Sequence, residues 1–239
     1  VSTKLINCWP NLMSKLANPN RLNPQLLSPV DPRIEKYMLS LTKATDLPIL
    51  SAMEKFAHEN NFPIVDRLVG IFLEFLSKTI SAQRIFEFGS GYGYSAFWFA
   101  RGMSANGQLF CTDGDAENLN QARYFLQATE HWRKIHFQTG LAQNIFHQTE
   151  GAFDICYNDA DKGDYPEIWT IARKRINPGG FYIADNVLWH GRVVLENPVD
   201  IMPGWTEAIL EHNQMIYEDP AFDTFINPTR DGVIVARKK

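Results

Sequence analysis

The spacing of apolar and polar residues changes once along the chain. Up to residue 80, apolar residues recur three and four positions apart, which is the spacing of one helix face. Asp46 and Pro48 suit the start of a helix, as N-cap and first-turn residue. Three helices are therefore predicted before any strand, over residues 34–44, 46–60 and 63–80.

From residue 84 onward, short apolar runs alternate with helical patterns. This alternation is typical of a parallel sheet whose strands are connected by helices. The apolar runs lie at residues 84–89, 108–113, 134–138, 153–158 and 180–184, and the helical patterns lie at 94–103, 115–129, 164–176 and 205–217. Two final runs, 222–226 and 232–237, are a few turn residues apart, which predicts an antiparallel hairpin.

Together these elements predict an α/β fold with a mostly parallel seven-stranded sheet, helices on both faces and a C-terminal antiparallel hairpin. A chain of 239 residues suits one domain of this kind. We expect that domain at residues 31–239, with N-terminal helices at 31–80 and the core at 81–239. Residues 1–30 are expected to form an arm, because X-Pro pairs prevent a helix from propagating there.

The composition is that of an ordinary globular chain with a slightly acidic balance. Its 23 Lys and Arg against 27 Asp and Glu give a net charge of -4, which provides no broad basic field for nucleic acid. Three cysteines without a CxxC pair, Cys8, Cys111 and Cys156, fit a reducing cytoplasm. No apolar stretch approaches the roughly 20 residues of a membrane span, and no signal-peptide pattern opens the chain. We therefore expect a cytoplasmic protein without a membrane partner.

One predicted strand is followed directly by alternating glycines, Gly89, Gly91 and Gly93, and then by a helix. Such a loop lets the backbone approach a ligand, and the helix start offers unpaired N–H groups. Glu87 lies inside the strand end, where an acid needs a cation or a hydroxyl. Asp113 ends the next strand, where an acid takes ribose hydroxyls in doubly wound folds. These features imply a nucleoside ligand.

Oxygen-bearing side chains also follow two later strands. Asp159-Ala160-Asp161-Lys162 comes after one run, and Asp185-Asn186 comes after the next. Because ligands bind outside the carboxyl ends of strands in open α/β sheets, these groups should gather beside the glycine loop. Two carboxylates and one amide oxygen form a hard site suited to Mg²⁺, Mn²⁺ or Ca²⁺. The scattered histidines provide no zinc set.

The Glu-x-Gly-x-Gly-x-Gly pattern resembles motif I of the class I S-adenosylmethionine (SAM) methyltransferases, and differs from the GxGxxG dinucleotide fingerprint. With the motifs at residues 159–165, 178–180, 185–191 and 231–232, the chain resembles the cation-dependent O-methyltransferases of the catechol and caffeoyl-CoA type. The resemblance runs from about residue 63 to the C-terminus. It implies a Rossmann-like class I methyltransferase fold, SAM and a divalent cation as cofactors, and a homodimer.

By this resemblance, Asp159, Asp185 and Asn186 would hold the metal, and Lys162 would be the catalytic base. The acceptor would be a small aromatic, catechol-like or vicinal-diol molecule whose two oxygens chelate the cation while Lys162 removes a proton. SAM would contact Val65, Glu87, Gly89, Ser90, Ser95, Asp113, Ala142 and Asp161.

The acceptor side departs from the family pattern at two positions. Asn158 replaces an apolar strand residue, which gives either a locally polar pocket or a simple hydrogen bond. His190 either contacts the acceptor or lies on the surface. Residues 194–205 are expected to form an acceptor-facing loop, and the residues expected to contact the acceptor are Tyr165, Trp189, His190 and Trp205.

Other functions stay open from the sequence. Methylation of a hydroxylated uridine in transfer RNA would use the same chemistry. It would need a basic face beside the pocket, for example from Arg84, Arg123, Arg133, Lys134 and Arg192. An NAD-dependent oxidoreductase is disfavoured by the glycine spacing and by the metal set, and a non-catalytic SAM-binding module by the presence of Lys162.

Overall fold

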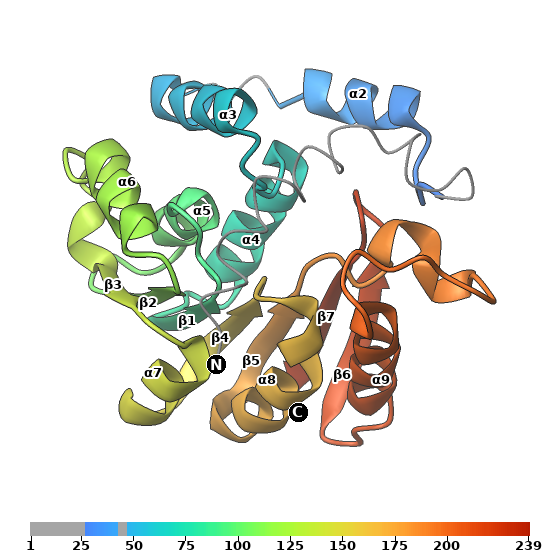
Figure 1. The fold of residues 1–239 in the computed structure, drawn as a ribbon. Coiled ribbons are helices and arrows are strands. Elements are labelled where there is room, and N and C mark those ends of the chain that lie inside the picture. The colour runs from blue at the N-terminus through green and yellow to red at the C-terminus, as the bar shows by residue number, and fades with distance from the viewer. Residues whose placement is uncertain (1–26, 43–46) are drawn as a thin grey trace.

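Seven strands form one sheet in the computed structural model, which describes residues 27–42 and 47–239 (Figure 1). The strands are β1 (Arg84–Phe88), β2 (Gln108–Asp113), β3 (Ile135–Thr139), β4 (Phe153–Asn158), β5 (Ile176–Ala184), β6 (Phe222–Asn227) and β7 (Val233–Lys238). Their order is β3-β2-β1-β4-β5-β7-β6. Pairs from β3 to β5 are parallel, whereas β7 is antiparallel to both β5 and β6. The predicted mostly parallel sheet with a C-terminal hairpin is confirmed.

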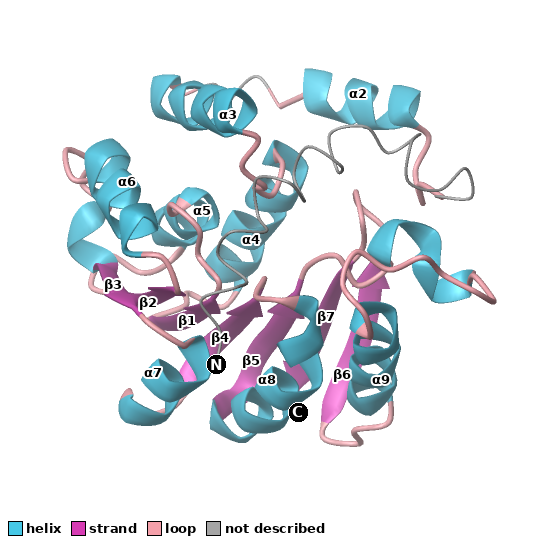
Figure 2. Cartoon of the chain, in the orientation of Figure 1, coloured by secondary structure: helices cyan, strands magenta, loops and turns pink. Residues whose placement is uncertain are grey.

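Helices cover both faces of this sheet (Figure 2). They are α2 (Pro32–Ser40), α3 (Pro48–Asn60), α4 (Arg67–Thr79), α5 (Tyr94–Gly102), α6 (Ala116–Leu126), α7 (Ala142–Gln148), α8 (Tyr165–Ala172) and α9 (Trp205–Tyr217). On one face, side chains such as Ile85 and Leu109 pack against α4 and α5. On the other, Phe86 and Tyr182 pack against α7, α8 and α9. The alternation of strand side chains thus supplies two cores from one sheet.

Three elements differ from the sequence prediction. The short helix α7 was not predicted, and Leu141 begins it without a side-chain cap. A 3-10 segment at Trp189–Val194 was also missed, because His190 and Gly191 inside it have positive φ. The helix predicted to residue 176 ends at Ala172, and β5 already begins at Ile176, after a short 3-10 turn. The early start of β5 is accompanied by a register shift against β4.

Some predictions lie outside the described residues. The arm predicted at 1–30 is described only from residue 27, and Cys8 and Asp46 are not described. The domain limits at residues 31 and 81 stay predictions. Within residues 27–42 and 47–239, no helix combines the length and apolar character needed to cross a membrane.

The parallel pairing aligns four strand ends in one row. Thr112 pairs with Phe88, Phe88 with Asn158, and Asn158 with Ala184. The next residue on each strand or loop therefore emerges at the same edge of the sheet, and these residues are Asp113, Gly89, Asp159 and Asp185. The predicted gathering of the glycine loop and the acids at one edge follows directly from this register.

Candidate functional site

The glycine loop between β1 and α5 is held in a conformation that suits glycine. Gly89, Gly91 and Gly93 have φ of 79°, 49° and 88°, in the left-handed region. A Cβ on Gly89 would lie 2.6 Å from the carbonyl oxygen of Asp159. The loop after β1 therefore touches the loop after β4, and only a bare backbone fits between them.

Glu87 is completely buried at the end of β1. Its Oε1 accepts a hydrogen bond from the Ser95 hydroxyl at 2.5 Å, and its Oε2 faces the Cys111 thiol at 3.4 Å. Burial raises the pKa of Glu87 to about 7, and the Ser95 hydrogen bond opposes that rise. A buried carboxylate with neutral donors around it suits a positively charged ligand group. The sulfonium and ammonium groups of SAM would be such groups.

Asp113 connects the glycine loop to the end of β2. Its Oδ2 accepts from the Gly91 N–H at 3.0 Å, and its Oδ1 accepts from Asp115 N–H and Asn118 Nδ2. Ser90 exchanges hydrogen bonds with Thr112 on the same strand. A carboxylate has about four lone-pair sites, so Asp113 keeps capacity for a sugar hydroxyl. Ala142 begins α7 shortly after Thr139, the residue that pairs with Asp113, which places it at the same end of the sheet.

Lys162 lies in a short 3-10 turn after β4 and is only 7% exposed. Its Nζ donates to Asp159 Oδ1 at 3.0 Å and to the Tyr165 hydroxyl at 2.7 Å. The Tyr165 hydroxyl donates in turn to the backbone oxygen of Asp185 at 2.9 Å. The Tyr165 side chain is fully buried. Its two hydrogen bonds connect the loop that holds Lys162 with the loop that holds Asp185. Asp161, beside them, is exposed.

Asp185 and Asp159 form a carboxylate pair at the ends of β5 and β4. Burial and the neighbouring Asp159 charge raise the pKa of Asp185 to about 7, whereas Arg230 and Lys162 oppose that rise. Asn186 has a positive φ of 57° and its N–H donates to Asp185 Oδ1. Two carboxylates that lie close enough for the charge of Asp159 to raise the pKa of Asp185, with the amide of Asn186 next in the chain, fit a hard divalent cation. In the described part of the chain, no three His, Cys, Asp or Glu side chains gather as a metal site, and the predicted set has an amide as its third ligand.

Three of the aromatic residues expected near the acceptor lie together. Trp189 is buried, its ring centroid is 5.7 Å from that of Trp205, and it is 5.8 Å from that of His190. Trp205 Nε1 would lie 3.4 Å from a Cβ on Gly163, next to Lys162. His190 is half-exposed, and its N–H donates to Asp231 at 2.5 Å. The cluster therefore lies beside the Lys162 turn, and its contact with an acceptor stays a prediction.

A buried hydrogen-bond chain beneath the site was not predicted. Asn158 Nδ2 donates to the Tyr182 hydroxyl at 3.1 Å, and that hydroxyl is 3.0 Å from His212 Nε2. His212 Nδ1 lies 3.1 Å from Asn213 Oδ1. Asn158 thus makes hydrogen bonds inside the core, which is the second of its two predicted roles. In the sequence, the one sign of this hydrogen-bond chain was Asn158, a polar residue in an otherwise apolar strand.

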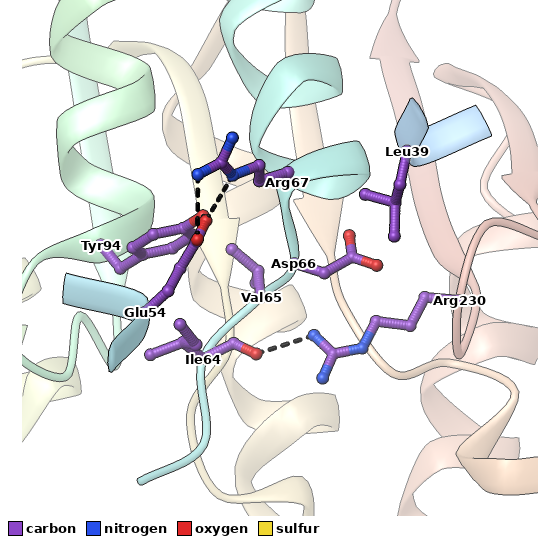
Figure 3. A pocket seen from close by; sticks show the side chains of 8 residues that line it. All are labelled: Leu39, Glu54, Ile64, Val65, Asp66, Arg67, Tyr94 and Arg230. Carbon is purple, nitrogen blue, oxygen red and sulfur yellow. Dashed lines mark hydrogen bonds and ion pairs between the residues drawn. The ribbon is translucent and has the colours of Figure 1, made fainter. Parts of the chain in front are cut away.

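A cavity of about 340 Å³ lies between the N-terminal helices and the sheet edge (Figure 3). Val65, one of the expected SAM contacts, lines it. Arg230, from the turn between β6 and β7, also lines it and donates to the Ile64 carbonyl oxygen at 2.7 Å. Arg230 was not predicted. Its place directly before the Asp231-Gly232 motif was the available signal.

Comparison with known proteins gives consistent matches. A family model described as O-methyltransferase matches residues 40–239. A catechol O-methyltransferase from Niastella koreensis is 32% identical over 184 residues, which cover 75% of this chain and 81% of that protein. Caffeoyl-CoA O-methyltransferase 1 from Eucalyptus globulus is 29% identical over 177 residues, 71% of this chain and 72% of that protein. A solved O-methyltransferase from Bacillus cereus in complex with SAH has a TM-score of 0.77 at 26% identity, covering 87% of this chain and 97% of that one.

Proposed function

This chain belongs to the O-methyltransferase family, and from that premise we propose that it transfers a methyl group from SAM to a hydroxyl of a small acceptor with two adjacent oxygens. The observation that carries the proposal is the contact between two loops at one sheet edge. Gly89, in the loop that suits the donor, lies against Asp159, in the loop that holds Lys162. Donor and acceptor sites would therefore share a wall.

On the donor side, two acids would each bind one part of SAM. The buried Glu87 carboxylate would face the positive charge of the methionine end. Asp113 would accept the ribose hydroxyls, and the Gly91 hydrogen bond keeps its carboxylate oriented toward the loop. Ser90, Ser95, Val65, Ala142 and Asp161 complete the set that the family resemblance assigns. Holding the donor at near-attack distance can contribute about 7 to 11 kcal/mol to the methyl transfer.

On the acceptor side, Lys162 would move a proton. As the free amine it would take the hydroxyl proton while the acceptor oxygen forms its bond to the methyl carbon and the sulfur–methyl bond breaks. Asp159, Asp185 and Asn186 would hold a divalent cation. When bound, that cation would lower the pKa of the acceptor hydroxyl and orient its two oxygens. Trp189, Trp205 and His190, whose rings lie together, would wall an aromatic acceptor.

A tRNA acceptor has less support from the side chains. Lys134 is buried and its Nζ donates to the Ala100 carbonyl oxygen at 2.7 Å. Arg192 is also buried and donates to the Val199 carbonyl oxygen. Arg84 is bound to the backbone at Glu150 and Ala152. Only Arg123 and Arg133 of the five expected residues are exposed, so this set does not form a contiguous basic face.

A homodimer is also part of the proposal. Helix α2 has no buried residue, and Ile34, Tyr37 and Leu41 are each more than half exposed. An apolar row of this kind suits a second copy of the chain. Light scattering across a concentration series should give twice the monomer mass, and a monomer mass at every concentration would remove this part.

The test of the reaction is methyl transfer from labelled SAM to caffeic acid, other catechols, and unmodified and hydroxylated tRNA. Each acceptor is assayed with Mg²⁺ and with EDTA. EDTA-sensitive labelling of a catechol is the expected result. Labelling of tRNA alone would select the other acceptor, and labelling that EDTA does not change would remove the metal from the mechanism.

A further inference from the structure

Arg230 occupies a backbone position that disfavours it. It lies in the turn between β6 and β7 with a φ of 55°, where a residue with a Cβ is strained and glycine is preferred. A strained residue persists when the surrounding structure or a function requires it. Because glycine would fit this backbone better, the presence of a side chain at position 230 needs an explanation.

The guanidinium of Arg230 makes little use of its donors. Its five N–H groups form one hydrogen bond with the described residues, to the Ile64 carbonyl oxygen at 2.7 Å. The side chain is nevertheless partly buried, and it lines the 340 Å³ cavity (Figure 3). Donors that make no bond to the described residues are available to a ligand, so a ligand that fills this cavity is expected to supply acceptors.

The other charged groups around the cavity already have partners. Glu54 accepts two hydrogen bonds from Arg67, at 2.7 and 3.0 Å, and one from the Tyr94 hydroxyl at 2.6 Å. Asp66 caps α4 by accepting from the Val69 N–H at 2.9 Å. Counted against the described residues, Arg230 thus keeps donors that a ligand could use. The remaining lining is partly apolar, with Leu39, Ile64 and Val65.

Arg230 also lies in the field of the proposed metal ligands. Asp185 and Asp159 act on its charge, together with Asp66 and Asp231. A divalent cation bound by Asp159 and Asp185 would neutralise those two carboxylates. Asp66 and Asp231 would then be the carboxylates that still act on Arg230, and its positive charge would attract an anion more strongly than before.

We propose that Arg230 is a specificity-determining residue that binds a carboxylate on the methyl acceptor, which makes the acceptor an acidic catechol or acidic vicinal diol. This inference rests on the proposed function. The two hydroxyls would lie at Asp159, Asp185 and Asn186, and the carboxylate would reach Arg230 from the same molecule. An arginine fork matches the two oxygens of a carboxylate. The carboxylate of SAM itself is the other source of the same chemistry.

The test measures binding by calorimetry on protein loaded with Mg²⁺ and S-adenosylhomocysteine (SAH). The ligands are 3,4-dihydroxybenzoate, 3,4-dihydroxyphenylacetate and caffeate, each paired with its methyl ester. We expect at least one acid to bind about tenfold or more tightly than its ester. In Arg230→Gln this preference should fall to about twofold or less, because one carboxylate-binding fork is lost. Arg230→Gly should behave in the same way and fold well, since glycine suits the φ of 55°.

The control is Arg33→Gln on the neighbouring helix α2, where Arg33 is 91% exposed and paired with Asp31. It should keep the acid preference and the SAH affinity of the native chain. If Arg230→Gln weakens SAH binding and leaves the acid preference intact, the carboxylate is that of SAM and the proposal is overturned. Equal affinity of the native chain for acids and esters, or no binding of any acid, also overturns it. Methylation of neutral catechols in that case would leave the proposed function standing, whereas failure to bind SAH would remove the proposed function itself.

Discussion

The Nζ of Lys162 lies 2.7 Å from the hydroxyl oxygen of Tyr165, and both side chains are buried. The lysine is therefore held by two hydrogen bonds, one to Tyr165 and one to Asp159, the second at 3.0 Å. Such contacts fix the direction of an otherwise flexible four-carbon side chain. A lysine held in this way keeps its nitrogen beside Asp159, one of the residues proposed to hold the metal.

Replacing this lysine should stop the chemistry and spare the donor. In Lys162→Met, we expect kcat to fall by about 10²–10⁴, the usual contribution of a positioned acid–base group. SAH affinity, measured by calorimetry, should change little, because no donor contact is assigned to Lys162. Turnover equal to that of the native chain would remove the base assignment.

Removing only the tyrosine hydroxyl should have a smaller effect on the same step. In Tyr165→Phe, the ring still packs on His212, whose centroid is 5.0 Å away, but Lys162 and the Asp185 carbonyl each lose a partner. We expect kcat to fall about tenfold with KM for the acceptor nearly unchanged, since a hydrogen bond to a charged group contributes about 1.5–3 kcal/mol. Steady-state kinetics separates the two constants. A rise in KM alone would instead indicate that Tyr165 contacts the acceptor, as the sequence suggested.

The sequence could predict which residues gather at one edge of the sheet, because the ends of parallel strands meet there. Glu87, the glycines, Asp113, Asp159 and Asp185 all lie at or just after strand ends, and parallel pairing brings such positions to one edge. The direction of a side chain within a turn follows no such rule. Tyr165 was expected to contact the acceptor, which stays a prediction; the first turn of α8 buries its side chain, and its hydroxyl meets Lys162.

Contacts between distant segments could not be read from the sequence. Asn158 meets Tyr182 because β4 and β5 pair in one particular register, and Tyr182 meets His212 because α9 packs on that face. Arg230 reaches Ile64 across 166 positions of the chain. Each of these contacts depends on packing, which a local pattern of apolar and polar residues does not encode.

The glycine at the contact between the two loops should be required for donor binding. In Gly89→Ala, the new Cβ would lie 2.6 Å from the Asp159 carbonyl oxygen at a φ of 79°. We expect SAH affinity to fall by about tenfold or more, because either the loop or its neighbour must shift. Gly114→Ala is the matched control, since nothing lies within 4 Å of its added Cβ. Similar SAH affinities for the two variants would contradict a close-packed donor loop.

Donor binding should weaken in acid because of Glu87. Burial raises the pKa of this carboxyl to about 7, so it takes up a proton as the pH falls through 7, and a cationic ligand then loses its counter-charge. SAM affinity at saturating Mg²⁺ should fall about tenfold between pH 8 and pH 6, by linkage to one proton. Glu87→Gln should bind SAM more weakly at pH 8 and lack this pH dependence. A native profile that is flat over the same range would show that Glu87 does not titrate against the donor.

The hydrogen-bond chain beneath the site should make folding stability sensitive to acid. The Tyr182 oxygen accepts from Asn158, so its proton points to His212 Nε2, which must be unprotonated, and Nδ1–H then donates to Asn213. Burial lowers the pKa of His212 to about 4 from the ordinary 6.5. The unfolded chain therefore binds this proton at a higher pH than the folded chain does, and stability falls as the pH drops from 6.5 toward 4.

Between pH 7.5 and pH 5, this one group should lower the free energy of unfolding by about 2 kcal/mol. Urea unfolding of the native chain and of His212→Gln at both pH values measures the effect as a difference of differences. The glutamine side chain can still accept from Tyr182 but does not titrate, so the extra loss seen in the native chain belongs to His212. An equal loss in both proteins would mean that the folded chain accommodates a charged imidazole, and the assigned direction of the hydrogen bonds would then be wrong.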